Sequence, residues 1–234
     1  FLYKISFNFS DHVIFTNKSN LKYFKKKSII TDHKYTLVPA SGVNLQRYKK
    51  FKKLKKSDYF RILFIGRLIK SKGVVDLIQI FNGLNIKNKK LIIIGKEDKF
   101  SPESVNLQPM IKGNKKITYI EHSDKLENFY NNSDIFLFPS YSEGMPTVVM
   151  EAFACGLPCF TYKVPGCDDI IINNKTGYKV NKYNKNQMIR IIEKFYNNKR
   201  QLNLISKNCL KYSTKFDRKK IVSKIVKLYE KSAK

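Results

Sequence analysis

The sequence predicts an α/β fold in which a doubly wound parallel sheet is covered by helices on both faces. Short apolar runs recur from residue 60 onward, and segments with helical spacing separate them. Runs that are apolar on both faces are typical of strands buried between two layers of helices. The composition agrees: 42% of the 234 residues are hydrophobic, which argues against a disordered chain or a disulfide-stapled miniprotein.

The first 45 residues are expected to form a separate region that precedes the sheet. An apolar run over 13–15 is followed by a short helix, for which Asn17 or Ser19 is a suitable cap. A short strand over 36–38 then ends at a proline, and 41–44 is expected to turn.

Strands and helices alternate in the main part of the chain. The strands are predicted at 62–65, 91–94, 117–120, 135–138 and 158–161, and the helices near 74–84, 103–112, 124–131 and 147–154. After Tyr178 the sequence is expected to be helical to its end. Apolar stripes within 188–195 and 221–229 are expected to pack in the core.

The chain is strongly basic, with 46 Lys and Arg against 18 Asp and Glu and a formal net charge of +28. Such a charge favours nucleic acid, an anionic membrane surface or phosphorylated substrates as partners. No helix-turn-helix, zinc-finger or RNP-type aromatic motif accompanies the charge, so no nucleic-acid partner is expected. A coding sequence rich in A and T also produces many lysines on solvated faces, which is the plainer explanation for most of them.

The segment 48–56 is a candidate for contact with a membrane. Tyr48, Phe51 and Leu54 are three residues apart with lysines between them, which on a helix gives a basic amphipathic face. Such a face can lie on an anionic leaflet. A solvated connector is the alternative interpretation of the same residues.

The cysteines and the amino terminus indicate a reduced, cytoplasmic protein. Cys155, Cys159, Cys167 and Cys209 lie in or beside apolar stretches, and their spacing to the three histidines does not suit a metal site, so no metal is expected. No leader follows Phe1, and no apolar run reaches the roughly 18 residues of a membrane span. A chain that begins with Phe is expected to be a piece of a longer one.

The loop 66–73 follows the first strand of the sheet and is a candidate anion site. Ligands of doubly wound sheets bind outside the carboxyl ends of the strands. Gly66 and Gly73 allow tight backbone turns, while Arg67 and Lys72 suit a diphosphate, arginine as a bidentate fork and lysine as a point charge. A plain basic loop is the alternative.

The loop 139–147 follows the strand at 135–138 and leads into a helix. Gly144 permits close backbone approach, and Pro146 suits the first helical turn, whose free N–H groups would accept a phosphate. Glu143 precedes them, and Glu151 stands in an otherwise apolar helix, where a carboxylate is costly without a partner. Sugar or ribose hydroxyls would be suitable partners, and a solvated helix position is the alternative.

These residues resemble a known family. The two main motifs are Phe64-Ile65-Gly66-Arg67-Leu68 with Lys72-Gly73, and Glu143-Gly144-Met145-Pro146 continuing to Glu151-Ala152-Phe153-Ala154-Cys155-Gly156-Leu157-Pro158. Further matches are Pro39-Ala40-Ser41-Gly42-Val43-Asn44, Asp134 to Ser140, Pro165-Gly166 and Gly177-Tyr178. Over roughly residues 36–200 the chain resembles the carboxyl-terminal, donor-binding half of family 4 glycosyltransferases, which have the GT-B fold with Rossmann-like domains. Ala40-Ser41 departs from the family, which more often has Asn before its Gly.

The resemblance implies a domain organisation. Residues 1–45 would be the end of an amino-terminal acceptor domain with the interdomain linker, and 46–215 the domain that binds the nucleotide-sugar donor. Residues 216–234 would be a carboxyl-terminal helix that packs back toward the acceptor domain. On this reading most of that acceptor domain, and with it the acceptor site, would be missing from the sequence.

The resemblance also implies roles for individual residues. Glu143 would face the donor sugar and Glu151 the ribose hydroxyls, as the two acids of the family's E-x7-E motif. Arg67 and Lys72, with Gly66, would hold the nucleotide diphosphate and stabilise the charge that builds on it. The remaining donor-binding positions are the backbone of Gly144, Met145, Pro146, Thr147 and Val148 for phosphate and sugar, and Ser123 and Asp124 for the base.

The function implied is that of a retaining glycosyltransferase in bacterial surface-polysaccharide or lipopolysaccharide assembly. It would transfer a sugar from a nucleotide donor, UDP-sugar in preference to GDP-sugar, to a glycan or lipid-linked acceptor, without a cofactor. The expected location is cytoplasmic, with peripheral attachment at the inner face of the membrane as an option. The alternatives are a nucleotide- or membrane-binding fragment without activity of its own, and a nucleotide-sugar epimerase of the same fold.

Overall fold

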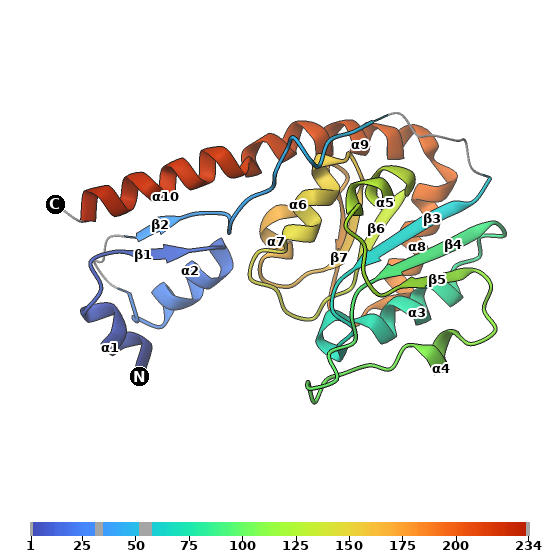
Figure 1. The fold of residues 1–234 in the computed structure, drawn as a ribbon, viewed down its shortest axis with the longest axis horizontal. Coiled ribbons are helices and arrows are strands. Elements are labelled where there is room, and N and C mark those ends of the chain that lie inside the picture. Colours follow the sequence, from blue (N-terminus) through green and yellow to red (C-terminus); the bar gives the residue numbers. More distant parts are fainter. Residues whose placement is uncertain (1, 31–34, 52–57, 233–234) are drawn as a thin grey trace.

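A computed structural model describes residues 2–30, 35–51 and 58–232. Its main part is a six-stranded sheet (Figure 1). The strands are β3 (Phe60–Ile65), β4 (Lys89–Ile94), β5 (Ile117–Ile120), β6 (Ile135–Phe138), β7 (Cys159–Tyr162) and β8 (Gly177–Val180). They are ordered β5-β4-β3-β6-β7-β8, and every pair is parallel. This is the strand order of a doubly wound sheet, so the predicted fold class is confirmed.

The strands form because their residues are apolar on both faces. All four residues of β6 and of β7 are buried, and so are five of the six in β3. The Phe64 and Phe138 rings lie 5.8 Å apart on neighbouring strands, and Phe136 stacks on Phe138 at 5.7 Å. Burial on both faces explains why the strands show no alternation of polar and apolar residues.

Helices cover the sheet and follow the strands in turn. They are α3 (Val74–Gly83), α4 (Gln108–Ile111), α5 (Leu126–Asn132), α6 (Thr147–Ala154), α7 (Cys167–Ile170), α8 (Lys185–Asn197) and α9 (Lys199–Ser213), with short 3-10 turns η1 (Lys70–Lys72) and η2 (Thr214–Phe216). α3 packs against α8, while α6 packs against α5 and α9. Right-handed crossovers place α3 and α6 on opposite faces, because the strand order runs in opposite directions from β3 and from β6.

This reversal creates a crevice at the carboxyl ends of β3 and β6. The chain leaves β3 toward one face and β6 toward the other, although the two strands are neighbours in the sheet. The loops 66–73 and 139–146 therefore begin side by side at the topological switch point, where doubly wound proteins bind their ligands.

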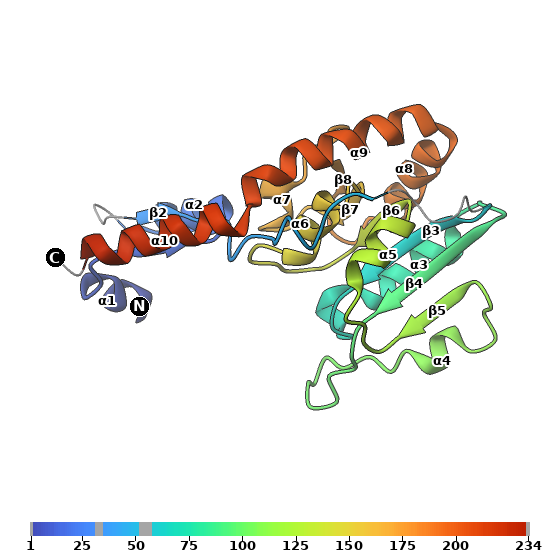
Figure 2. The same ribbon diagram turned by 45° about the horizontal axis from the view of Figure 1, so that its top comes forward.

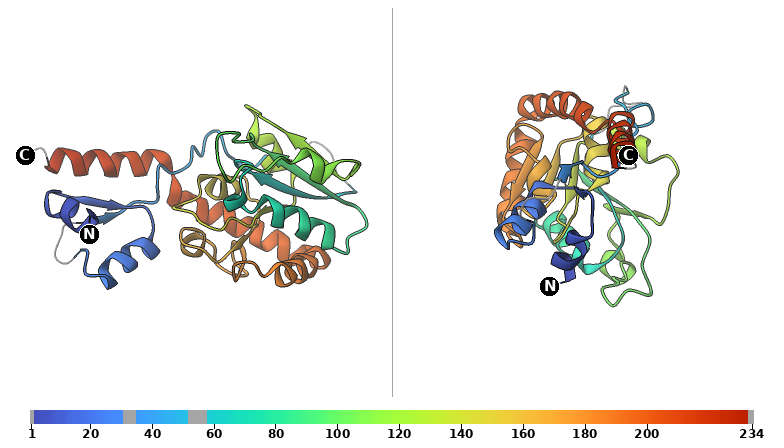
Figure 3. Two further views of the ribbon diagram at one scale, coloured as in Figure 1. Left: turned by 90° about the horizontal axis from the view of Figure 1, so that it is seen from below. Right: turned by 90° about the vertical axis from the view of Figure 1, so that its left-hand side faces the viewer.

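A smaller unit lies at one end of the molecule and projects beyond the sheet (Figure 3). It contains α1 (Leu2–Asn8), α2 (Lys18–Lys26) and two parallel strands, β1 (Val13–Phe15) and β2 (Tyr35–Leu37), and α10 (Arg218–Ser232) runs beside it (Figure 2). The Lys224 Nζ donates to the carbonyl oxygen of Leu37 at 3.4 Å. Beyond β2, the N–H of Val43 donates to the carbonyl oxygen of Phe216 at 2.7 Å, and both side chains belong to the core of the main part.

Several predicted elements differ in the structure. β8 extends to Val180, so the chain is not helical from Tyr178 onward; this short edge strand has two partly exposed residues and lacks a continuous apolar run. The helix predicted over 103–112 is reduced to the four residues of α4. The N–H of Val105 bonds the carbonyl of Leu68 and the N–H of Lys70 bonds the carbonyl of Glu103, so the backbone pairs with loop 66–73 instead of forming a helix.

Two predicted surfaces also differ. The stripe within 221–229 is only partly core, because Ile221 is buried whereas Val222 and Tyr229 are exposed. In segment 48–56, residues 52–57 lie outside the described part. The rest is not helical, and Tyr48 is buried against Tyr130 at 5.9 Å, so its ring is not available to a membrane. Within the described residues, no helix combines the length and the apolar character that crossing a bilayer requires.

Candidate nucleotide-sugar site

Lys72 and Glu143 meet at the switch point. Lys72 ends the turn η1 after β3, and Glu143 lies in the loop after β6. The Lys72 Nζ and the Glu143 Oε1 are 2.6 Å apart, and the hydroxyl of Ser140 donates to the same Oε1 at 2.6 Å. Only 8% of the Glu143 side chain and 20% of the Lys72 side chain are exposed. The structure thus brings together two of the residues predicted for catalysis, at a place that is largely shielded from water.

The backbones of the two loops are also joined. The N–H of Tyr141 donates to the carbonyl of Ser71 at 2.8 Å, and the hydroxyl of Ser140 reaches the same oxygen at 3.2 Å. Gly73 has φ +72°, and a Cβ there would lie 1.9 Å from the carbonyl oxygen of Pro139. Only glycine allows this approach, so Gly73 is needed to seat one loop on the other.

The start of α6 offers free N–H groups beside Glu143. Pro146 is the N-cap of α6, and the helix begins at Thr147. Among the described residues, no acceptor is present for the N–H groups of Gly144, Met145, Thr147 and Val148. Gly144 is exposed and Pro146 is buried. Free N–H groups at the positive end of a helix favour an anion, which is the property that the sequence predicts for this loop.

Arg67 lines a neighbouring cavity of about 430 Å³ at the carboxyl ends of β3, β4 and β5. Gly66 and Ser123 line the same cavity, together with Lys96 and His122. The Arg67 Nη1 is 3.2 Å from the Asp98 Oδ2, and 63% of the Arg67 side chain is exposed. The guanidinium therefore pairs with Asp98 rather than with Glu143, and it is accessible to a ligand in the cavity.

Glu151 is held by tyrosines rather than by the two loops. The hydroxyl of Tyr130 donates to the Glu151 Oε2 at 2.9 Å and also bonds the carbonyl of Val148 at 3.1 Å. Burial raises the pKa of the Glu151 carboxyl, while hydrogen bonds from Tyr130 and Tyr48 and the charge of Arg47 oppose the rise. The phenol donors thus offset only part of the cost expected for a carboxylate in this apolar helix, and the pKa of Glu151 stays raised.

The two residues predicted for the base lie apart. Ser123 lines the cavity, and its hydroxyl oxygen accepts the N–H of Lys125 at 3.2 Å. The side chain of Asp124 does not line that cavity; it is 93% exposed and pairs with His122 at 2.9 Å. Its backbone carbonyl accepts a hydrogen bond from the guanidinium of Arg47.

Some residues of the site are not singled out from the sequence. Gly95 directly follows β4 at φ +156°, and a Cβ there would lie 1.8 Å from the carbonyl oxygen of Gly66. Gly95 could have been selected from the sequence because it directly follows a predicted strand. Nothing in the sequence indicates that Tyr130 contacts Glu151, or that Asp98 contacts Arg67, because each pair forms only through the fold.

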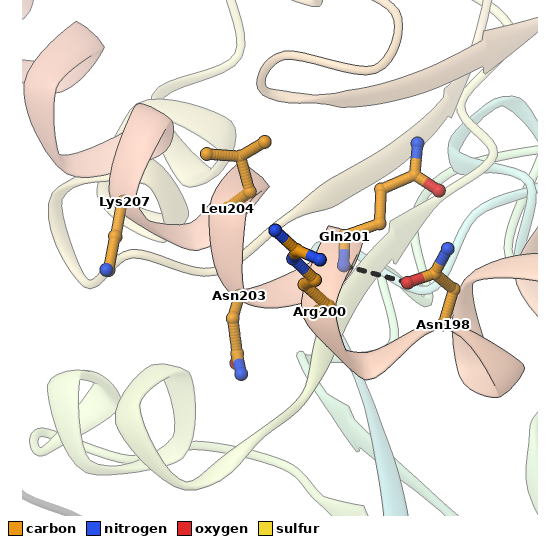
Figure 4. Close-up of a pocket in the computed structure, with 6 residues that line it drawn as sticks. All are labelled: Asn198, Arg200, Gln201, Asn203, Leu204 and Lys207. Carbon is orange, nitrogen blue, oxygen red and sulfur yellow. Dashed lines mark hydrogen bonds between the residues drawn. The ribbon is translucent and has the colours of Figure 1, made fainter.

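A separate pocket lies on α9, away from these loops. Figure 4 shows that its lining comes from α9 and the residue before it, 198–207, and none of the predicted site residues takes part. Arg200 on this face offers a basic side chain remote from the switch point, which is useful as a control.

Comparisons with known proteins identify the family and the fold. The family model described as glycosyl transferases group 1 matches residues 46–212. The capsular polysaccharide biosynthesis glycosyltransferase CapM of Staphylococcus aureus is 34% identical over 143 residues, which are 60% of this chain and 38% of CapM. The N,N'-diacetylbacillosaminyl-diphospho-undecaprenol alpha-1,3-N-acetylgalactosaminyltransferase of Campylobacter jejuni is 28% identical over 100% of this chain and 64% of its own length.

A solved structure is similar in three dimensions. HepE of Anabaena, crystallised with UDP and glucose, superposes with a TM-score of 0.83 at 17% identity, covering 98% of this chain and 66% of HepE. At this identity the likeness concerns the fold, and it supports the predicted fold class. The chain spans between about two fifths and two thirds of the length of these relatives. Since the family model matches well over half of the chain, the protein belongs to the glycosyl transferases group 1 family.

Proposed function

We propose that this chain is the donor-binding part of a retaining glycosyltransferase that uses a UDP-sugar. The observation that carries the proposal is the contact of Lys72 with Glu143 at the switch point, beside the free N–H groups that begin α6. Together they supply positive charge for a diphosphate and a carboxylate for sugar hydroxyls, within one shielded site.

Each predicted residue has a role in this proposal. Lys72 moves from Glu143 onto the diphosphate, Arg67 moves from Asp98 onto it, and Glu143 is then free to accept hydrogen bonds from the donor sugar. Glu151 receives the ribose hydroxyls in place of a tyrosine hydroxyl. Ser123 lies in the cavity proposed for the base, whereas Asp124 is left without a supporting contact there.

In this proposal the reaction proceeds with retention of configuration. The bond between the anomeric carbon and the phosphate oxygen breaks, and the acceptor oxygen bonds to the same face of that carbon, so its configuration is retained. The acceptor proton passes to the departing diphosphate. Lys72 and Arg67 stabilise the negative charge that grows on the diphosphate, and the reaction requires no cofactor in this proposal.

The wider role follows from the relatives. CapM is named for capsular polysaccharide biosynthesis, and the C. jejuni enzyme for a diphospho-undecaprenol acceptor. We therefore propose an acceptor that is a glycan or a lipid-linked sugar, in the assembly of a bacterial surface glycan. In this proposal the unit formed by α1, β1, α2 and β2 is the end of the acceptor domain.

Thermal unfolding with UDP, GDP or ADP tests the proposal. A ligand at a hundredfold excess over its Kd adds about 2.7 kcal/mol of stability. For a chain of this size that corresponds to a rise in Tm of roughly 5–10 °C. We expect UDP to give the largest rise.

The test variant is Arg67→Ala, which should lose most of the rise in Tm. The matched control is Arg200→Ala, which should keep the rise, because Arg200 lines the separate pocket on α9. A larger rise in Tm with GDP would indicate that the donor carries guanosine instead of uridine. No rise with any nucleotide, or equal loss in both variants, would contradict donor binding at the switch point.

A further inference from the structure

The beginning of α2 lies directly on the loop that carries Glu143. Asn17 is the N-cap of α2 and is completely buried, although it belongs to the smaller unit. Its Oδ1 accepts the N–H of Asn20 at 2.6 Å, and its Nδ2 donates to the carbonyl oxygen of Gly144 at 2.7 Å. Because the side-chain amide is planar, capping α2 with one end fixes the direction of the other.

A second contact holds α2 in this place. The carboxylate of Asp169 in α7 accepts hydrogen bonds from the N–H groups of Lys18 and Ser19 at 2.5 and 3.2 Å, and from the hydroxyl of Ser19 at 3.1 Å. A negative charge at the amino end of a helix is stabilising. The first turn of α2 is thus bonded to the main domain, and Asn17 is kept on the Gly144 carbonyl.

The backbone of Gly166 also packs closely against the carbonyl of Gly144. Gly166 has φ +79°, and a Cβ there would lie 2.3 Å from this oxygen. The carbonyl of Gly144 and the N–H of Met145 belong to one planar trans peptide, so they point in opposite directions. Holding the carbonyl toward Asn17 therefore turns the N–H of Met145 away from α2, and in the described structure nothing accepts it.

We propose that Asn17 is a positioning residue that orients the peptide between Gly144 and Met145 for the phosphate or sugar of the donor. The inference rests on the proposed function of this loop. It makes the affinity for the donor depend on a residue of the smaller unit, 127 positions earlier in the chain. In this way the unit proposed to belong to the acceptor domain acts on the donor loop without touching the donor.

The variant Asn17→Asp separates this role from helix capping. Aspartate caps helices as well as asparagine, but its carboxylate cannot donate to Gly144. The matched control is Asn198→Asp, because Asn198 caps α9 in the same way, accepting the N–H of Gln201 at 3.0 Å. Asn17→Ser is the second variant, since serine also caps helices, is uncharged, and is too short to replace the amide.

Two measurements are made on each variant. The first is the Kd for UDP by calorimetry, which we expect to rise roughly tenfold or more for both Asn17 variants, as after loss of one buried hydrogen-bond donor, and to stay unchanged for Asn198→Asp. The second is the methyl NMR spectrum without nucleotide. The chain has four methionines, and the Met145 signal should shift in the Asn17 variants while that of Met188 in the core stays in place.

The outcomes separate the two proposals. A Kd for UDP that remains unchanged in both folded Asn17 variants overturns the positioning role and leaves the proposed function intact. If the parent protein binds no UDP, the proposed function fails, and the Met145 signal alone then decides whether Asn17 orients the loop: a shift supports it and an unshifted signal overturns it.

Discussion

The pair of Lys72 and Glu143 allows a quantitative prediction for the protein without nucleotide. Replacing Lys72 by methionine keeps most of the side-chain volume but removes the charge that faces Glu143 at 2.6 Å. Breaking a fully buried ion pair costs about 3–5 kcal/mol. Here the hydroxyl of Ser140 still donates to the carboxylate, and a fifth of the Lys72 side chain is exposed, so we expect a loss nearer 2–3 kcal/mol.

A double-mutant cycle isolates the pair. Glu143→Gln should cost about 1–2 kcal/mol, because glutamine can still accept from Ser140 while Lys72 loses its counter-charge. The double variant should be more stable than the sum of the two losses predicts, with a coupling of about 1–2 kcal/mol. The free energies of unfolding are measured by urea denaturation.

The control uses an exposed pair at the same edge of the sheet. Lys96 and Glu121 are 3.9 Å apart with 79% and 63% of their side chains exposed, so Lys96→Met should change the stability by less than about 0.5 kcal/mol. A coupling between Lys72 and Glu143 that is as small as this, with both single variants folded, would refute the reasoning that the switch point shields the pair.

Two further predictions concern the rest of the site. Glu151→Gln should raise the free energy of unfolding at neutral pH, because it removes a carboxylate whose ionised form is disfavoured by burial, while abolishing the stabilisation by UDP. Burial raises the pKa of Glu151 above its usual 4.5, so the parent protein loses stability as the pH rises through the raised pKa. The extra stability of the variant should therefore vanish as the pH is lowered to 4.5. Urea denaturation at several pH values measures this, and a stability difference that does not change with pH would contradict it. Gly95→Ala should cost about 3 kcal/mol or more, because its Cβ would meet the Gly66 carbonyl, whereas Gly113→Ala, also at positive φ but with open space around it, should cost about 1 kcal/mol. Equal melting temperatures for the two alanine variants would show that the close approach does not matter.

The amino-terminal unit has a part in this site that its sequence does not suggest. Asn17 is recognised in the sequence only as a helix cap, and the structure confirms that cap. The same side chain also donates to the carbonyl of Gly144, and Asp169 holds the first turn of α2 in place by accepting the N–H of Lys18. A residue outside the match to the family model is therefore in contact with the loop on which the proposed chemistry depends.

Elements with a local signal can be predicted from the amino-acid sequence of this protein. Buried strands show as apolar runs, and the residues directly after those runs are the ones that the sheet brings to one edge, so Arg67, Lys72 and Glu143 can be selected from the sequence alone. Where local signals are weak or partners distant, the prediction is wrong: it misses the short edge strand β8, and it overestimates the helix around α4, whose preceding backbone bonds to Leu68 and Lys70.

Which side chains meet depends on the tertiary structure. Lys72 and Glu143 are 71 residues apart, and Asn17 and Gly144 are 127 apart. Such contacts depend on the order of the strands and on how a separate unit docks, and no periodicity along the chain encodes either. The same holds for Glu151, whose partner Tyr130 comes from another helix, and for Val222, which helical spacing assigns to the core but which no described element covers.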